Sequence, residues 1–211
     1  MKSKGKVTQA IHGRSDRAER SAVFPIYQTT TFGVDKSDDF APILDGESDA
    51  FVYSRYGNPT VRNVEEKLAQ LEGTEDALLF SSGMAAITSA ILSVVGSGDT
   101  LVASRPVYGG TYKFLLETAP KLGIRVVLLD GAAIYELDQH APDAKAVFFE
   151  TPANPTCMVL SIERIVAAAQ RIGAVTLIDN TFASPYNQQP VAMGVDIIIE
   201  SVTKYIAGHS D

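Results

Sequence analysis

Lys204 follows Ser201 and Thr203 in the stretch SVTKYIAGHSD, directly after the apolar run DIIIE (196–200). A lysine amine close to a protein core can form an imine with an aldehyde, and neighbouring hydroxyl groups can bind an anion. A lysine at the end of a strand is also commonly a solvated surface residue, and such hydroxyls are commonly caps. The chemistry of this segment therefore depends on the groups that lie beside it.

An acid and a helix start supply two such groups. Asp179 ends the apolar run AVTLID, and a buried carboxylate is costly unless a cation or several donors pair with it. Ser82, Gly83 and Met84 follow the run DALLF and offer backbone N–H groups at a helix start, which suits a phosphate. Separately, each feature reads as ordinary capping. Together with Lys204 they match pyridoxal phosphate, which takes an imine, an acid on its ring nitrogen and a cradle for its phosphate.

Other segments add aromatic and polar groups. Tyr108, in RPVYGGTY, can stack on a flat ring, although an aromatic residue there is commonly part of a core. Asn154, in ETPANPT, can donate to a ring oxygen, although Asn-Pro is also common in turns. Tyr53 and Arg55, in YSRYGNPT, either form a surface ion pair or, placed against a neighbouring subunit, clamp a phosphate.

Secondary-structure patterns indicate how these groups are positioned. Apolar residues at helical spacing, followed by Gly73, predict a helix over 58–73. After it, apolar runs predict strands at 76–81, 99–103, 124–130, 146–150, 174–179 and 196–200. Segments with helical character lie between them, most clearly at 83–95, 110–122 and 161–172.

Continuous apolar strands alternating with helices are typical of a mostly parallel sheet that is covered on both faces. We therefore expect an α/β fold of three layers. Residues 1–58 lack sustained periodicity and are predicted to form an extended N-terminal arm, and residues 59–211 are predicted to form the large domain. Ligands of such sheets bind at the carboxyl ends of the strands, where the candidate residues lie.

Composition excludes several other classes. The 211 residues carry 18 basic and 25 acidic side chains without a basic stripe, which makes nucleic acid an unsuitable partner. Cys157 is the single cysteine, and the start MKSKGKVTQAIHGR lacks the apolar core of a signal peptide, so a cytoplasmic protein is expected. No apolar stretch reaches the ~20 residues of a membrane span. His12, His140 and His209 lack metal-ligand spacing, and no metal site is predicted.

The chain resembles the pyridoxal-phosphate enzymes of cysteine and methionine metabolism, the family of cystathionine γ-synthase, cystathionine γ-lyase, methionine γ-lyase and the O-acylhomoserine sulfhydrylases. The resemblance runs from TQAIHG to the last residue. Its motifs, in family order, are YSRYGNPT, SSGMAAI, VYGGTY, ETPANP, IDNTFASPY and SVTKYIAGHSD. It implies the large domain of a fold type I pyridoxal-phosphate transferase.

The resemblance also implies a role for each candidate residue. Lys204 would carry the cofactor as an imine, Asp179 would pair with the pyridine nitrogen, and Asn154 would contact the ring oxygen. Tyr108 would stack on the ring and assist the leaving group. The phosphate would be held by the turn that starts at Ser82, through backbone groups of Gly83 and Met84, and by hydroxyls of Ser201 and Thr203. Tyr53 and Arg55 would reach the phosphate of a partner subunit, so that a homodimer is the minimal site and a homotetramer is expected.

The implied reaction takes place at Cγ of an amino acid. Uptake of a thiol or sulfide after loss of the γ-substituent gives replacement, whereas hydrolysis to a 2-oxo acid and ammonia gives elimination. Methionine γ-lyases typically carry a cysteine where this chain has Gly110. We therefore expect γ-replacement on an O-acylhomoserine by cysteine or sulfide, with γ-elimination as the alternative.

Members of this family continue for about as long again and include a C-terminal domain with the arginine that binds the substrate carboxylate. The sequence is therefore interpreted as the N-terminal half of such an enzyme, without that domain. A protein of another class, a non-catalytic remnant that binds the cofactor or an interaction module, is the competing hypothesis. A nucleotide-binding α/β domain is disfavoured because a Gly-rich fingerprint is missing.

Overall fold

The computed structural model describes residues 21–209, so the TQAIHG motif and His12 lie outside the described residues. The chain forms two compact units, Met1–Leu79 and Phe80–Asp211. Among residues 21–209, no helix combines the length and the apolar character that crossing a bilayer requires.

The first unit contains the short helix α2 (Phe40–Leu44) and the longer helix α3 (Pro59–Glu72). The side chain of Asn58 caps α3 by accepting a 2.8 Å hydrogen bond from the backbone N–H of Thr60. Gly73 ends the helix in the left-handed conformation, at φ +79°, where a glycine carries no steric penalty. The helix predicted over 58–73 is thus confirmed.

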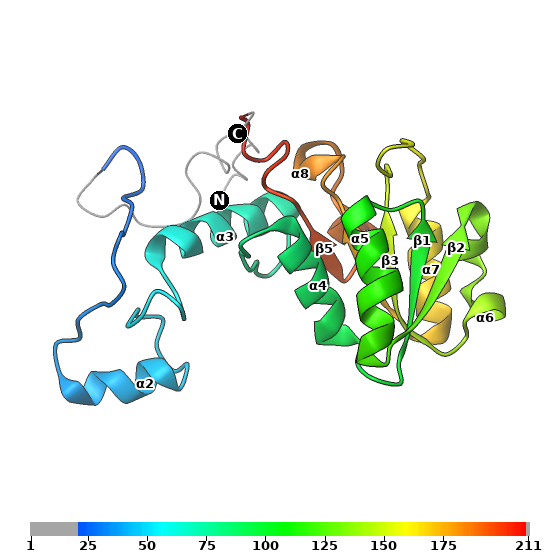
Figure 1. The fold of residues 1–211 in the computed structure, drawn as a ribbon. Helices are drawn as coiled ribbons and strands as arrows, with labels where there is room; N and C mark the ends of the chain where they lie inside the picture. Colours follow the sequence, from blue (N-terminus) through cyan, green and yellow to red (C-terminus); the bar gives the residue numbers. More distant parts are fainter. Residues whose placement is uncertain (1–20, 210–211) are drawn as a thin grey trace. The chain divides into compact units, whose positions relative to one another are not determined.

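The second unit is built on a five-stranded sheet in which all strands run parallel (Figure 1). Its order is β2-β1-β3-β4-β5, so that β3 lies at the centre. The strands are β1 (Thr100–Arg105), β2 (Arg125–Asp130), β3 (Ala144–Glu150), β4 (Val175–Asp179) and β5 (Ile197–Ile199). Five of the six predicted strands are confirmed.

The strand predicted over 76–81 is wrong, because none of these residues joins the sheet. Leu78 keeps 74% of its surface exposed, so the run is apolar without being buried. A strand exists only through hydrogen bonds to a neighbour, and in the part of the chain that the structure describes no segment pairs with this one.

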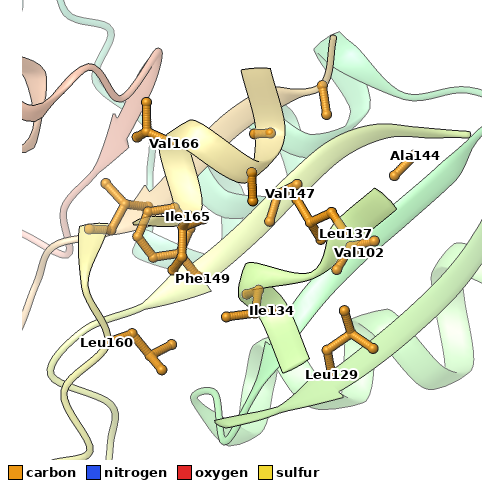
Figure 2. Close-up of a cluster of buried hydrophobic side chains, with 14 of the residues drawn as sticks. Val102, Leu129, Ile134, Leu137, Ala144, Val147, Phe149, Leu160, Ile165 and Val166 are labelled. Carbon is orange, nitrogen blue, oxygen red and sulfur yellow. The ribbon is translucent and has the colours of Figure 1, made fainter. Parts of the chain in front are cut away.

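Helices cover both faces of the sheet and bury alternate residues of each strand. On one face, α4 (Gly83–Val94) and α5 (Gly109–Lys113), which continues as helical turns to Leu122, cover the first core. On the other face, α6 (Leu137–His140) and α7 (Ile162–Ile172) cover the second core, which Figure 2 shows. The second core includes Val102, Val147, Phe149, Ile165 and Val166. The three-layer α/β architecture predicted from the sequence is confirmed.

The central strands show how this alternation sets the direction of each side chain. In β3, Phe148 belongs to the core under α4 and Phe149 to the core under α7. In β4, Leu177 and Ile178 divide in the same way. Because side chains of a strand alternate between faces, the next residues of both strands point to the α4 side. The polar ends of the strands therefore gather on one face at the carboxyl edge.

Candidate active site

The start of α4 lies against the turn that follows β5. A Cβ atom placed on Gly83 would stand 2.9 Å from Cβ and 3.0 Å from Oγ of Ser201. Contacts this short are not tolerated between carbon atoms, so the approach depends on the missing side chain of Gly83. The structure thus brings together two of the residues expected at the phosphate.

Two backbone donors at the N-terminus of α4 have no hydrogen-bond partner among residues 21–209. Ser82 caps the helix, since its Oγ accepts from the N–H of Ala85 at 3.1 Å and its carbonyl accepts from Ala86 at 3.0 Å. The N–H groups of Gly83 and Met84 precede the first bonded donors of the helix. Ser82 itself is occupied in capping, so the free donors come from the two residues after it.

Asp179 is buried at the end of β4, at 6% exposure, and burial raises the pKa of its carboxyl group. Thr181 opposes this shift through both its hydroxyl and its backbone N–H, the latter at 3.1 Å from Oδ1. The same hydroxyl accepts a 2.8 Å hydrogen bond from the N–H of Ser201. Thr181, which the sequence analysis did not single out, therefore joins the acid to the turn after β5.

Tyr108 stands at the start of α5, and the residue is 43% exposed. A Cβ atom on Gly110 would lie 2.7 Å from Cε1 of Tyr108 and 2.9 Å from Sδ of Met84. The hydroxyl of Thr111 also approaches this sulfur, at 3.9 Å. The ring of Tyr108 therefore packs against Gly110, close to the side chain of Met84, which belongs to the start of α4.

Asn154 lies in the segment after β3, which a side-chain network ties to the segment after β4. Gln188 donates through Nε2 to the carbonyl of Thr151 at 2.9 Å and to Oδ1 of Asn180 at 2.8 Å. The 3.3 Å bond from Asn180 Nδ2 to the carbonyl of Gln188 closes the network. The side chain of Asn154 itself is half-buried.

Lys204 and Thr203 lie in the turn after Ser201, where the N–H of Lys204 donates to the carbonyl of Ser201 at 3.0 Å. Both side chains are exposed, which corrects the expectation that this amine lies near a core. The chain passes from the cradle formed with Gly83 directly into the turn that carries the amine.

Glu150 is a member of this group that sequence reasoning missed. It ends β3 opposite Asp179 in the register of the neighbouring strand, and it is 5% exposed. Burial and the charge of Asp179 raise the pKa of its carboxyl group to about 8, while hydrogen bonds from the backbone of Tyr108 and Asn154 act in the opposite direction. The only signal for Glu150 in the sequence is its place at the end of the apolar run AVFFE. The sequence does not show which groups its carboxyl group contacts.

Tyr53 and Arg55 belong to the other compact unit. The guanidinium of Arg55 lies 4.7 Å from the ring centroid of Tyr53, and the side chain is exposed. No carboxylate pairs with Arg55 within residues 21–209. The two residues thus form an exposed cation-π pair with an unneutralised charge, rather than a surface ion pair.

The residues of the second unit fit pyridoxal phosphate. Asp179 is a buried carboxylate without a cationic partner among the described residues, which suits a protonated ring nitrogen. The approach of Gly83 to Ser201 leaves a cradle that a side chain would fill, beside free N–H donors at a helix start. The fold and the site therefore define an α/β protein of the pyridoxal-phosphate class.

Comparison with known proteins identifies the family. A model of the family described as "Cys/Met metabolism PLP-dependent enzyme" matches residues 7–211, and the chain belongs to this family. Cystathionine β-lyase of Lactococcus lactis subsp. cremoris is 42% identical over 207 residues, which are 97% of this chain and 52% of that protein. L-Methionine γ-lyase of Porphyromonas gingivalis is 40% identical over 210 residues, 98% of this chain and 53% of that protein.

A solved structure shares both the fold and the cofactor. A Campylobacter jejuni protein described as a "putative O-acetylhomoserine (thiol)-lyase" superposes with a TM-score of 0.92 at 34% identity, over 99% of this chain and 52% of that chain. That protein carries N'-pyridoxyl-lysine-5'-monophosphate. Pyridoxal phosphate is therefore the cofactor of this family, and the site described above fits it. The chain spans about half the length of the curated relatives it matches.

Proposed function

We propose that this chain forms the cofactor-binding part of an enzyme of sulfur amino-acid metabolism that acts at Cγ of its substrate, by γ-replacement on an O-acylhomoserine with cysteine or sulfide. The observation that carries the proposal is the gathering of Gly83, Ser201 and Asp179 at the carboxyl edge of one parallel sheet. Pyridoxal phosphate bound there supplies an electron sink for carbanions at the substrate.

Each residue near the ring has a role that follows from its chemistry. The amine of Lys204 holds the aldehyde carbon, and the carboxylate of Asp179 holds the ring nitrogen in its protonated form. The amide of Asn154 donates to the ring oxygen, and the ring of Tyr108 stacks on the cofactor face. These four groups would fix the plane of the cofactor ring, and a substrate bond that breaks must stand perpendicular to that plane.

The phosphate has its own set of donors. The free N–H groups of Gly83 and Met84 point from a helix start, whose dipole favours an anion. The hydroxyls of Ser201 and Thr203 complete the cradle from the turn after β5. Ser82 caps the helix through its hydroxyl, and so it would affect phosphate binding by positioning the backbone N–H groups of the residues that follow it.

Proton transfer falls to Lys204 and Tyr108. When it is not bound to the cofactor, the amine of Lys204 would serve as the general base that removes the proton at Cα. Loss of a proton from Cβ then allows the γ-substituent to leave, with the hydroxyl of Tyr108 supplying a proton. Addition of a thiol at Cγ, with return of the protons to Cβ and Cα, would give replacement. Return of a proton to Cγ, followed by hydrolysis with water to a 2-oxo acid and ammonia, would give elimination.

Gly110 favours replacement over elimination of the methionine γ-lyase type. A cysteine at this position would place its Cβ within 3 Å of both Tyr108 and Met84, so this arrangement of the ring requires a glycine. γ-Elimination is the second candidate, because curated relatives at 40% and 37% identity are named L-methionine γ-lyase and cystathionine γ-lyase.

We further propose a homodimer as the minimal functional unit and a homotetramer as the complete assembly. The exposed, unneutralised Arg55 and its neighbour Tyr53 are then donors to the phosphate of the partner subunit. The substrate is a small amino acid, and the cytoplasm is the proposed compartment.

Reconstitution tests the cofactor role. Purified protein mixed with pyridoxal phosphate is expected to gain a visible absorption band and, after borohydride reduction, a label on Lys204. Lys204→Ala is expected to lose both. A wild-type protein without band or label would refute the proposal.

Substrate assays separate the reactions. O-Acetylhomoserine, O-succinylhomoserine, cystathionine and methionine are supplied in turn, with and without cysteine or sulfide. A thioether product indicates replacement, and a 2-oxo acid with ammonia indicates elimination. Failure of all four substrates with a protein that binds the cofactor would favour the non-catalytic hypothesis.

A further inference from the structure

Glu150 occupies the centre of the carboxyl edge. Its strand, β3, lies between β1, which leads to Tyr108, and β4, which ends at Asp179. Glu150 and Asp179 are paired in register, and both point to the α4 side of the sheet. A carboxyl group at this place is therefore within reach of segments that leave two different strands.

The contacts of Glu150 go to the two segments that carry the ring-binding side chains. Hydrogen bonds reach its carboxyl group from the backbone of Tyr108 and from the backbone of Asn154. Its own N–H donates to the buried Oγ of Ser104 in β1 at 3.3 Å. One buried side chain thus joins the start of α5 to the turn after β3.

The surroundings of Glu150 favour a neutral carboxyl group. It is 5% exposed, and its Oε2 atom is buried without a hydrogen bond in the part of the chain that the structure describes. Register partners of parallel strands lie about 5 Å apart, so a second buried negative charge beside Asp179 would be strongly repelled. Among residues 21–209, no lysine or arginine forms an ion pair with either acid.

Of the two acids, Asp179 is the one suited to keep its charge. It receives hydrogen bonds from the backbone and the hydroxyl of Thr181, which stabilise a carboxylate. Glu150 has an unpaired oxygen instead. Of the two acids, Glu150 is therefore assigned as the protonated one.

We propose that Glu150 is a positioning residue of the cofactor site, where its neutral carboxyl group binds the backbones of Tyr108 and Asn154 and so fixes both side chains for the cofactor ring. The contact with the cofactor rests on the proposed function. The anchoring of the two segments does not, since it is a property of the protein without ligand.

The variants Glu150→Gln and Glu150→Ala separate shape from charge. Glutamine keeps an oxygen acceptor in the same place without a charge, so it is expected to replace a neutral acid. Alanine removes the acceptor and leaves both backbone groups unpaired. Glu117→Ala removes an exposed carboxyl group from the helical layer on the α4 side and serves as the matched control.

Amide hydrogen exchange of the ligand-free protein tests the anchor. Exchange at the N–H groups of Tyr108 and Asn154 is expected to rise about tenfold in Glu150→Ala and to stay within about threefold of wild type in Glu150→Gln. Unchanged exchange in the alanine variant would overturn the proposal. If that variant does not fold, the glutamine variant decides, since loss of protection there overturns the proposal and retained protection supports it.

Cofactor binding is measured on the same variants. The dissociation constant of pyridoxal phosphate is expected to rise about tenfold in Glu150→Ala, with a weaker visible circular dichroism band, and to be nearly unchanged in Glu150→Gln and Glu117→Ala. A glutamine variant as impaired as alanine would show that the charge is needed and would overturn the neutral form. If wild-type protein binds no cofactor, the proposed function fails, whereas amide exchange still decides the anchoring role.

Discussion

Gly83 and Ser201 meet at a distance that only a glycine allows, since a Cβ atom on Gly83 would lie 2.9 Å from Cβ of Ser201 and 3.4 Å from its Cα. The start of α4 and the turn after β5 can therefore approach this closely only because Gly83 has no side chain. This contact joins a segment before the first strand to a segment after the last one. It fixes the free N–H groups of the helix beside the hydroxyl of the turn.

Gly83→Ala is expected to push the turn of Ser201 away from the helix, because the added methyl group meets backbone-proximal atoms rather than a flexible tip. An overpacked contact costs about 1–3 kcal/mol, which corresponds to a loss of about fivefold to about 150-fold in affinity for pyridoxal phosphate if the whole cost falls on the bound state. Gly96→Ala is the control, because its Cβ would meet only an Asp99 oxygen at 3.9 Å. Equal affinities of the two variants, measured by absorbance titration, would contradict the proposed cradle.

Gly110 sets the orientation of Tyr108. Gly110→Ala places a Cβ atom at 2.7 Å from the ring, which must rotate to relieve the overlap. We expect weaker stacking on the cofactor, seen as a smaller visible circular dichroism band of the bound cofactor, and a slower reaction. Gly109→Ala is the neighbouring control, since its Cβ would have no atom within 4 Å. A dichroism band that is unchanged in Gly110→Ala would disprove this role of the glycine.

The buried acid pair predicts how stability depends on pH. The pKa of Glu150 is raised from 4.5 to about 8 by burial and by Asp179, so between these values the native state keeps a proton that the unfolded chain has lost. The free energy of unfolding of the ligand-free protein should therefore fall as pH rises through this window. Asp179, whose pKa is raised by burial, contributes with the same sign.

Denaturant unfolding of the ligand-free protein at about pH 5 and about pH 8 measures this slope. Glu150→Gln removes the titrating group and is expected to flatten the dependence of stability on pH. A glutamine variant with the slope of the wild-type protein would show that Glu150 titrates normally in the fold.

The proposed clamp between subunits predicts complementation. Arg55→Ala is expected to weaken cofactor binding about tenfold while leaving the stability of the ligand-free chain within about 0.5 kcal/mol, because the side chain is exposed. Lys204→Ala blocks labelling in its own subunit. If Arg55 serves the partner's site, mixing the two variants restores one intact site in each mixed dimer, or about a quarter of all sites.

Borohydride labelling of the mixture, compared with each variant alone under limiting cofactor, measures this restoration. Labelling of the mixture at the average of the separate variants would place Arg55 and Lys204 in the same subunit's site, against the proposal.

The fold was predictable where a local pattern carries the information. The helix over 58–73 has its own cap and its own glycine stop, and the central strands are continuous apolar runs between helices. The run 76–81 has the same composition but no neighbour among the described residues, and pairing is a property of two segments. Composition alone therefore could not separate this run from a strand.

The same distinction applies to the site. Asp179 and the start of α4 were singled out because groups at strand ends converge on one edge of a parallel sheet. Glu150 ends an apolar run as Asp179 does, but neither Glu150 nor Thr181 has a partner that can be recognised from the sequence alone. Their roles arise from the register of β3 with β4 and from a hydroxyl that meets the backbone of Ser201.

Thr181 links the acid to the phosphate turn, and its hydroxyl is the part that does so. Thr181→Val keeps the shape of the side chain but leaves the N–H of Ser201 without its 2.8 Å acceptor and removes the hydroxyl donor of Asp179, which keeps only the backbone N–H of residue 181. Because that donor lowers the pKa of Asp179, its loss raises the pKa further and makes the carboxylate a poorer partner for a protonated ring nitrogen.

We therefore expect Thr181→Val to bind pyridoxal phosphate about tenfold more weakly than wild type, whereas Thr181→Ser, which keeps the hydroxyl, stays close to wild type. Absorbance titration of the ligand-free variants measures both constants. A valine variant with wild-type affinity would mean that Asp179 and the turn of Ser201 are positioned independently of this hydroxyl.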